Sequence, residues 1–259
     1  MSTSYGSRGT LQGLDAGVRR VAPSFGKQLH LTYSQKADGI VVVESDAERY
    51  VSHMLTLDPE VFSFATQPFT VDLIERRIHR ATADVEAARA RYKRVTGQKF
   101  YTPDFGVQWH LTGQWGHDVT AIEVKLEGYE GDGKDLQRME LGRNVIEAAG
   151  MEFLRVVWPR SQRHPLRTNL PLLMKAMQRV DLWPDPDMVV SVEEAFEHGL
   201  TTVRDLCCAL SLSPNVIPSF LASGLLSASV GQEPIRGAMK IELAHGDLGF
   251  LSVMRGLAQ

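Results

Sequence analysis

Cysteine is nearly absent from this chain: Cys207 and Cys208 are the only two among 259 residues, and they are adjacent. Adjacent cysteines have neither the spacing of a zinc site nor an easy disulfide geometry. The sequence therefore excludes a disulfide scaffold and a cysteine-ligated metal centre. We expect two buried apolar thiols in a protein of a reducing compartment.

Long apolar runs are also missing, since no stretch approaches the roughly 20 residues of a membrane-spanning helix. No signal-peptide pattern opens the chain. We therefore expect a cytoplasmic protein without a membrane partner. Strong net charge is lacking too, with 28 Lys and Arg against 31 Asp and Glu. Any affinity for DNA must then come from local basic patches or from partner proteins.

The length and a hydrophobic share of 43% allow a catalytic domain of about 150 to 200 residues plus a small second one. Residues 1–27 are rich in Ser and Gly and lack periodicity, which predicts a flexible arm. Two prolines within residues 183–186 predict a rigid linker. We therefore expect a catalytic domain over 28–182 and a separate small domain over 187–259.

Two short segments carry the most informative chemistry, and both are predicted to be β-strands: Tyr101-Thr102-Pro103-Asp104-Phe105 and Ala121-Ile122-Glu123-Val124-Lys125. Side chains alternate along a strand, so Glu123 and Lys125 share one face and Ile122 shares the other with Val124. If the strands are hairpin neighbours, Asp104 and Glu123 converge. Two carboxylates beside an ammonium suit Mg²⁺ held by carboxylates, a backbone carbonyl and water.

An amphipathic helix is predicted from Ser45 to Leu55, after short strands at residues 30–33 and 40–43. Ser45 at the N-cap and Glu48 three residues later form a capping box. A glutamate in this position usually folds back on the N-cap amide and has no other role. Spacing alone therefore favours a structural role for Glu48 over a functional one.

Residues 75–99 form the most basic window of the chain. We predict that a helix capped by Thr82 or Asp84 runs to Arg94 and displays arginines beside the Asp104 strand. The window is either a sequence-independent clamp for the DNA backbone or an ordinary solvated helix face. The residues assigned to the clamp are Arg76, Arg77, Arg80, Arg89, Arg91, Lys93 and Arg94.

The rest of the chain predicts a glycine-rich loop over 127–133, a helix over 134–149, a buried strand over 153–157 and a helix near 170–180. Beyond the linker, helices opening at Ser191 and Thr201 and a third over 213–221 precede two candidate strands. Three helices and a hairpin are typical of a winged-helix domain. Its third helix contains no cation, so we expect protein docking rather than base reading.

Residues 28–160 resemble TnsA, the endonuclease subunit of heteromeric cut-and-paste transposases, which belongs to the PD-(D/E)xK nuclease superfamily. Five landmarks occur in the order of that family: Glu44-Ser45-Asp46-Ala47-Glu48-Arg49, Leu57-Asp58-Pro59-Glu60-Val61, Gln67-Pro68-Phe69, Pro103-Asp104-Phe105 and Glu123-Val124-Lys125. The resemblance implies an α/β fold with a restriction-endonuclease-like mixed central sheet flanked by helices, plus a small winged-helix-like C-terminal domain.

The resemblance also implies a role for each site residue. Asp104, Glu123 and the Val124 carbonyl would hold Mg²⁺, or Mn²⁺ in its place, and Glu48 would help to hold a metal or its water. Lys125 would orient or deprotonate the attacking water. It could equally be no more than a salt-bridge partner of Glu123. Its loss would then cost stability rather than cleavage.

The implied function is cleavage of double-stranded DNA at the 5′ ends of a bacterial transposon, during transposition at the nucleoid. A DDE-type transposase, TnsB, and an AAA+ ATPase, TnsC, are the implied partners. One alternative is a free-standing PD-(D/E)xK restriction or phage-defence nuclease, and a second is a non-catalytic adaptor. His110 and His117 between the two catalytic strands suggest zinc only weakly, because no cysteine joins them.

Overall fold

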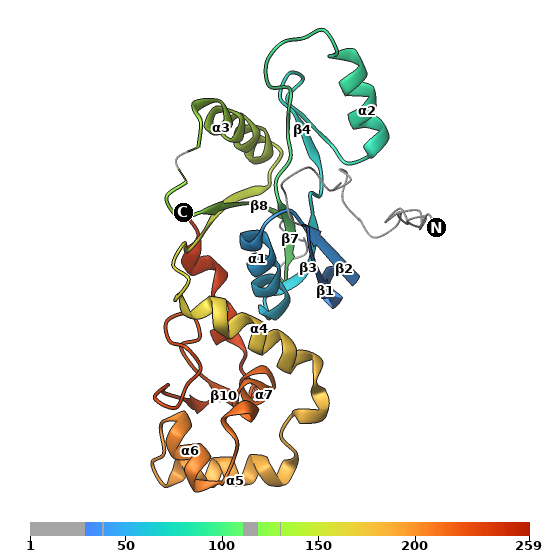
Figure 1. Cartoon of the computed structure of the whole chain (residues 1–259). Helices are drawn as coiled ribbons and strands as arrows, with labels where there is room; N and C mark the ends of the chain where they lie inside the picture. Colours follow the sequence, from blue (N-terminus) through green and yellow to red (C-terminus); the bar gives the residue numbers. More distant parts are fainter. Residues whose placement is uncertain (1–28, 38, 111–118, 130) are drawn as a thin grey trace, which may run out of the picture.

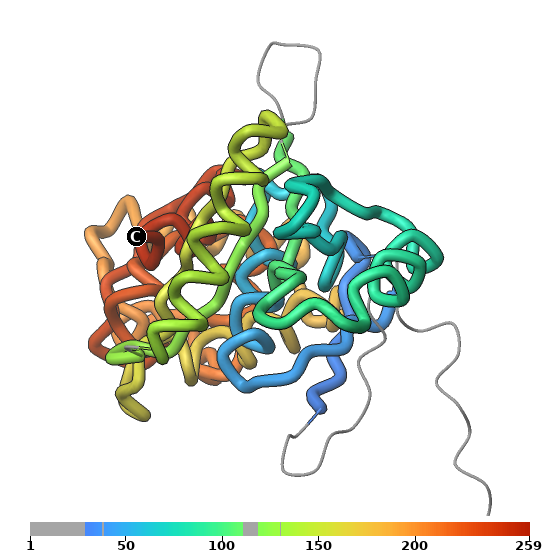
Figure 2. The backbone as a smooth tube through the Cα atoms, turned by 90° about the horizontal axis from the view of Figure 1, so that it is seen from above, coloured from blue at the N-terminus to red at the C-terminus, as the bar shows by residue number. Residues whose placement is uncertain are grey.

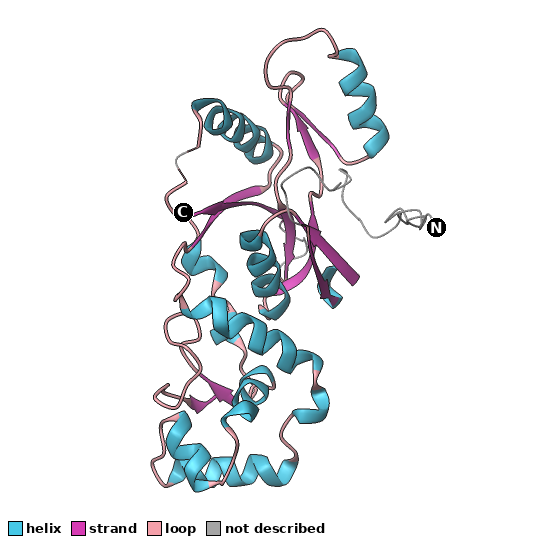
Figure 3. Cartoon of the chain, viewed as in Figure 1, coloured by secondary structure: helices cyan, strands magenta, loops and turns pink. Residues whose placement is uncertain are grey.

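A computed structural model describes residues 29–37, 39–110, 119–129 and 131–259 of the chain. The predicted arm at 1–27 and His117 lie outside the described residues. The fold is α/β, as predicted, with helices packed around several sheets (Figures 1 and 3). A small sheet and α2 lie at one end of the molecule, α4 to α7 lie at the other, and the main sheet lies between them (Figure 1).

The first described elements confirm the predicted hairpin and helix. β1 (His30–Ser34) pairs antiparallel with β2 (Gly39–Val43), and α1 (Asp46–Leu57) follows at once. The hydroxyl of Ser45 caps α1 by accepting a hydrogen bond from the Glu48 amide at 3.1 Å. The chain leaves the helix at Asp58, just before Pro59.

The main sheet has four strands in the order β3 (Val61–Thr66), β7 (Phe105–Trp109), β8 (Val119–Leu126) and β9 (Glu152–Trp158). β7 pairs antiparallel with its neighbours β3 and β8, whereas β9 runs parallel to β8, so the sheet is mixed. The two segments are hairpin neighbours only through Phe105, and the prediction of one strand over residues 101–105 is wrong: Tyr101 belongs to the second sheet, and residues 102–104 lie outside any strand. The register of β7 and β8 sets Phe105 against Ile122.

A second sheet has three short strands in the order β5 (Arg77–His79), β4 (Thr70–Asp72) and β6 (Phe100–Tyr101). The helix α2 (Thr82–Arg91) follows β5 in the chain. Two details of the predicted helix are wrong. Its N-cap is Ala81, which offers no side-chain cap, and the helix ends three residues before Arg94. Because Thr82 and Asp84 already lie inside the first turn, their side chains are not in the capping position.

Both faces of the main sheet are covered, and alternation along β8 separates the two cores. Ile122 and Val124 join α1 in one hydrophobic cluster. Ala121 joins Val145 and Ile146 of α3 (Gly133–Ala148) in the other. Viewed from above, α3 runs between α2 on one side and the C-terminal residues on the other (Figure 2). Glu123 and Lys125 therefore face α3.

The C-terminal region holds α4 (Pro165–Gln178), α5 (Pro186–Glu197), α6 (Val203–Ala209) and α7 (Ile217–Ala222), then the antiparallel pair β10 (Leu226–Ser227) and β11 (Glu242–Leu243). The predicted order of three helices and a hairpin is present. However, α4 and α5 each begin five residues before the predicted start. In both cases a proline takes the first turn, where its missing N–H costs nothing.

This region packs on the main sheet without a separating gap in the core. One cluster of buried residues contains Val41 and Leu55 as well as Phe220 and Met254. The Asn169 side chain of α4 donates to the Val230 and Glu233 carbonyls, and the Gln259 amide donates to the Arg155 carbonyl of β9 at 2.9 Å. The prediction of a domain boundary at 183–186 stays a prediction.

Within the described ranges no single helix has the length and hydrophobicity to cross a membrane. The segments Val203–Ala209 and Pro214–Ala222 meet those criteria only when taken together, and they are bent by 119°. Their apolar side chains, including Leu206, Ile217 and Leu221, belong to the buried core.

Candidate active site

The hairpin of β7 and β8 brings the two predicted acidic residues to adjacent strands. Asp104 lies immediately before β7, and its Oδ2 accepts a hydrogen bond from the Val124 amide at 2.7 Å. The Gln67 amide donates to the Asp104 carbonyl at 2.9 Å, which ties the segment to the Gln-Pro step. The carboxylate of Asp104 is thus fixed beside Glu123 and Val124.

Glu123 is buried, with 5% of its surface exposed, between two partners on the α3 side of the sheet. Tyr101 donates its hydroxyl to Oε2 at 2.6 Å, and the Lys125 ammonium lies 2.7 Å from Oε1. Burial, followed by the negative charge of Glu123, raises the pKa of Tyr101 well above its usual value. Tyr101 therefore keeps its proton at neutral pH and donates a hydrogen bond to Glu123.

Lys125 is shared between two carboxylates, because its Nζ also lies 3.5 Å from Oδ2 of Asp135 in α3. It sits over the Tyr129 ring, 4.9 Å from the centroid. Burial lowers the pKa of Lys125, but the charges of Glu123 and Asp135 oppose this and leave it above its usual value. The side chain carries a positive charge at neutral pH.

Glu48 folds back on the start of α1, as predicted, but its partners are the Glu44 amide and the Ser45 hydroxyl rather than the N-cap amide, and it also lines the candidate site. Its Oε1 accepts from the Ser45 hydroxyl at 2.6 Å and its Oε2 from the Glu44 amide at 2.9 Å. Burial raises the pKa of Glu48, and the charges of Glu44 and Glu123 add to that effect. The cap holds the carboxylate in place at the end of α1.

These side chains line one cavity of about 430 Å³ at the end of the β7–β8 hairpin. Burial raises the pKa of Asp104 well above its usual value, and the negative charges of Glu123 and Glu48 raise it further. The carboxylates therefore lie close enough to repel each other. The cavity is bipolar, since acidic and basic groups both line it: Glu44, Glu48, Asp104 and Glu123 against Arg89, Lys125 and Arg138.

The donor set fits a hard cation in kind. Every candidate ligand is an oxygen. A bound cation would relieve the repulsion that the carboxylates of Glu123 and Glu48 exert on Asp104. Within the part of the chain that the structure describes, no three side chains of His, Cys, Asp or Glu form a ready-made metal cluster. Mg²⁺ commonly keeps several waters and uses only one or two carboxylates, so a polar cavity of this size suits it.

The seven basic residues assigned to the DNA clamp are all exposed, but they do not share one position. Arg89 alone among them lines the carboxylate cavity, with its guanidinium 5.9 Å from the Phe100 ring. Arg77 and Arg91 pair with Glu75 at 3.3 and 3.2 Å, and Arg80 lies over the Phe69 ring. Arg76 has a left-handed backbone, with φ of 52°, in the turn before β5. Lys93 and Arg94 follow α2.

Four residues at the site were not found from the sequence: Tyr101, Tyr129, Asp135 and Arg138. Tyr101 donates to Glu123, whereas the Tyr129 hydroxyl donates to Asp135 at 2.8 Å. Asp135 and Arg138 lie one turn apart on α3 and form an ion pair. The spacing of three residues on a helix indicates that pair. Which face of α3 lies against β8 depends on tertiary packing, which local sequence patterns do not indicate.

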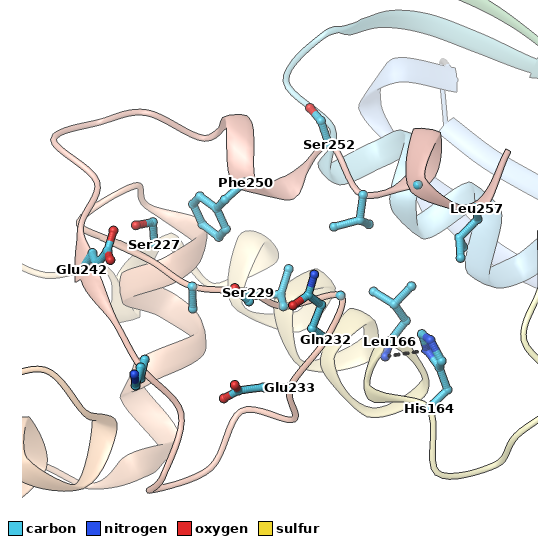
Figure 4. A pocket seen from close by; sticks show the side chains of 16 residues that line it. His164, Leu166, Ser227, Ser229, Gln232, Glu233, Glu242, Phe250, Ser252 and Leu257 are labelled. Atoms are coloured by element: carbon cyan, nitrogen blue, oxygen red, sulfur yellow. Dashed lines mark hydrogen bonds between the residues drawn. The ribbon is translucent and has the colours of Figure 1, made fainter.

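A larger cavity, of about 670 Å³, lies between the start of α4 and the C-terminal segments (Figure 4). Its walls include Ser227, Ser229 and Phe250, with the exposed side chains of Glu233 and Glu242 at the rim. None of the predicted site residues lines it. We assign the candidate site to the smaller cavity, because converging charged groups rather than volume determine chemistry.

Comparison with known proteins does not extend the assignment: the chain matches no protein-family model, and no curated protein shows significant similarity to it.

Proposed function

We propose that this protein is a metal-dependent DNA endonuclease of the PD-(D/E)xK type that acts as the TnsA-like subunit of a transposase. The observation that carries the proposal is the bipolar cavity, in which Glu48, Asp104 and Glu123 converge beside Lys125 and two arginines. Carboxylates of this kind attract a divalent cation, and the cationic wall attracts a phosphodiester. The reaction proposed is hydrolysis of a phosphodiester at the 5′ ends of a transposon.

Each side chain has a role that its surroundings support. Bound at Asp104, Glu123 and the Val124 carbonyl, with help from Glu48, Mg²⁺ or Mn²⁺ would act as a Lewis acid toward the phosphate and the attacking water. The Val124 amide fixes the orientation of Asp104, and Tyr101 fixes that of Glu123. Lys125, which is charged at neutral pH, orients the water and stabilises the negative charge that develops on the phosphate.

The architecture is compatible with this assignment. A mixed sheet covered on both faces, with an acidic hairpin and a parallel strand after a helix, is the arrangement expected of a restriction-endonuclease-like domain. In the C-terminal region, α5 to α7 with β10 and β11 have the element order of a winged-helix-like domain. We propose that this region docks on partner proteins, since residues 213–221 carry no cation.

The proposed partners are the two ends of a transposon as double-stranded DNA, a TnsB-like DDE transposase and a TnsC-like AAA+ ATPase. A net charge of −3 supports this dependence on partners, because the chain has no global attraction to DNA. Arg89 and the exposed residues of the basic window would contact the backbone next to the cut.

The proposal is tested by strand-resolved cleavage. A transposon-end duplex, labelled in turn on each strand, is incubated with Mg²⁺ and the protein, with and without the transposase and ATPase encoded beside it. Cuts confined to the 5′ end that require the partners support the TnsA-like role. Partner-independent cuts at other sites favour the free-standing nuclease. Absence of cleavage with the partners present, in Mg²⁺ and in Mn²⁺, contradicts both nuclease roles and favours the non-catalytic adaptor.

A further inference from the structure

The second turn of α3 presents an arginine to the candidate active site. Arg138 lines the same cavity as Asp104, Glu123 and Lys125. Its side chain is 39% exposed, so it lies at the wall of the cavity, where a ligand can reach it. The proposed function counts Arg138 in the cationic wall but gives it no individual role.

Asp135 holds this arginine in place. Its Oδ1 pairs with Arg138 one turn along α3, while its Oδ2 accepts from the Tyr129 hydroxyl at 2.8 Å and lies 3.5 Å from the Lys125 ammonium. One carboxylate therefore connects two cations of the cavity wall. Because Asp135 is only 18% exposed, these contacts are better shielded from solvent than ordinary surface ion pairs.

Arg138 has unused hydrogen-bonding capacity. Its Nε is buried and has no hydrogen-bond partner among the described residues. Buried donors are normally satisfied, so the unpaired N–H leaves the guanidinium with a donor that Asp135 does not use. A guanidinium carries five N–H donors in a planar fork that matches two oxygens of a phosphate.

We infer that Arg138 is a catalytic residue that binds a non-bridging oxygen of the scissile phosphodiester, and that Asp135 is the positioning residue that aims it. This inference rests on the proposed function. In the hydrolysis, the water oxygen bonds to phosphorus, the bond from phosphorus to the leaving oxygen breaks, and one water proton ends on that oxygen. Arg138 stays protonated throughout and stabilises the charge on the phosphate oxygens.

The electrostatics of the cavity explain why such a residue is needed. The four carboxylates that line the cavity repel a phosphodiester, and Lys125 is already paired with Glu123 and Asp135. Arg89, the other arginine of the wall, is exposed on α2. Arg138 is thus the cation of this wall that is both anchored by a carboxylate and left with a buried donor.

The test is single-turnover cleavage of the transposon-end duplex with Mg²⁺ and the partners, by full-length Arg138→Gln, Arg138→Lys and Arg143→Gln. Arg143 is the matched control. It lies on the same helix, is half exposed and pairs with Glu147, and it does not line the cavity. We expect Arg138→Gln to be at least about 100-fold slower, as for loss of one donor to a transition-state oxygen. Arg138→Lys should be intermediate, and Arg143→Gln within about twofold of wild type.

A substrate with a methylphosphonate at the cut position separates contact with phosphate from a merely structural role. If Arg138 binds the removed oxygen, Arg138→Gln slows cleavage of this substrate by no more than about threefold. Positioning by Asp135 predicts that Asp135→Asn lowers the rate at saturating duplex with little change in the half-saturating concentration.

The outcomes separate the inference from the proposed function. Suppose that the wild-type protein cleaves and that Arg138→Gln either cleaves within threefold of the wild-type rate or shows the same defect on both substrates. Either result overturns the role of Arg138 and leaves the nuclease in place. Absence of cleavage by the wild-type protein overturns both. Urea unfolding of Arg138→Lys, which keeps the charge, identifies any loss caused by misfolding.

Discussion

Lys125 lies 2.7 Å from Glu123 and 3.5 Å from Asp135, so it has structural and chemical roles at once. Lys125→Met leaves the buried Glu123 carboxylate without its cation, while Asp135 keeps Arg138, and this costs about 1 to 3 kcal/mol of unfolding free energy. We also expect cleavage to fall by about 100-fold or more, the usual cost of removing one positioned group that stabilises charge in the transition state. Urea unfolding and single-turnover cleavage, with exposed Lys134→Met as control, measure the two effects. Loss of stability with normal cleavage would identify Lys125 as a salt-bridge residue only.

His53 makes the protein sensitive to mild acid. It is buried in α1 against the Tyr50 ring, and its Nδ1 has no hydrogen-bond partner among the described residues. Burial and, to a smaller extent, the Arg49 charge lower the pKa of His53 from 6.5 to about 4, against an opposing effect of Asp46. Between these pH values the unfolded chain binds a proton that the folded chain does not. Stability is therefore lost as the pH falls from about 6.5 to about 4.

The expected loss at His53 approaches about 3 kcal/mol at pH 4. Urea unfolding at pH 7, 5.5 and 4 measures it, and the difference between wild type and His53→Phe isolates this residue from the carboxylates. His53→Phe keeps a ring against Tyr50 and should flatten the pH dependence. Parallel curves for the two proteins would mean that His53 does not titrate as described.

At the scale of elements, α3 is fixed against β6 by a close approach. A Cβ added to Gly142 would lie 2.2 Å from the buried Tyr101 ring, which cannot move without leaving Glu123. Gly142→Ala should therefore cost about 1 to 3 kcal/mol and slow cleavage, despite the better helix propensity of alanine. Gly133→Ala on the same helix meets nothing within 4 Å and is the control. Equal stability of the two variants would contradict the contact.

Elements with local signals were predicted well from the sequence. The Ser45 cap, the Pro59 stop and the Gly150 terminator bound their helices as expected, with Gly150 at a φ of 78°. The cap of α2 was mispredicted, because Ala81 occupies that position without a side-chain bond. The contacts of Tyr101 and Arg138 were missed, since they arise from the packing of α3 on the sheet. Alternation along β8, by contrast, sufficed to place Glu123 with Lys125.

At the scale of the whole molecule, the C-terminal region contributes to the core of the sheet domain. Leu166, Leu170 and Leu173 of α4 are at most 1% exposed, within the cluster that includes Phe220 and Met254. A fragment ending at residue 182 exposes these side chains, and the burial of each contributes about 1.5 to 3 kcal/mol to the unfolding free energy. The total unfolding free energy of a domain is only about 5 to 15 kcal/mol. We expect fragment 28–182 to be largely unfolded by circular dichroism. A cooperative urea transition like that of the full chain would establish an independent domain.

Asp104 provides the most direct test of the account, because the site should keep an electrostatically unfavourable carboxylate for the sake of chemistry. Burial and the charges of Glu123 and Glu48 raise its pKa, so removing its charge relieves the folded state. Asp104→Asn keeps the shape and an acceptor for the Val124 amide. In urea unfolding, the variant should be at least as stable as wild type. In single-turnover cleavage with Mg²⁺ and the partners, it should be more than about 100-fold slower. Cleavage at the wild-type rate would contradict the account.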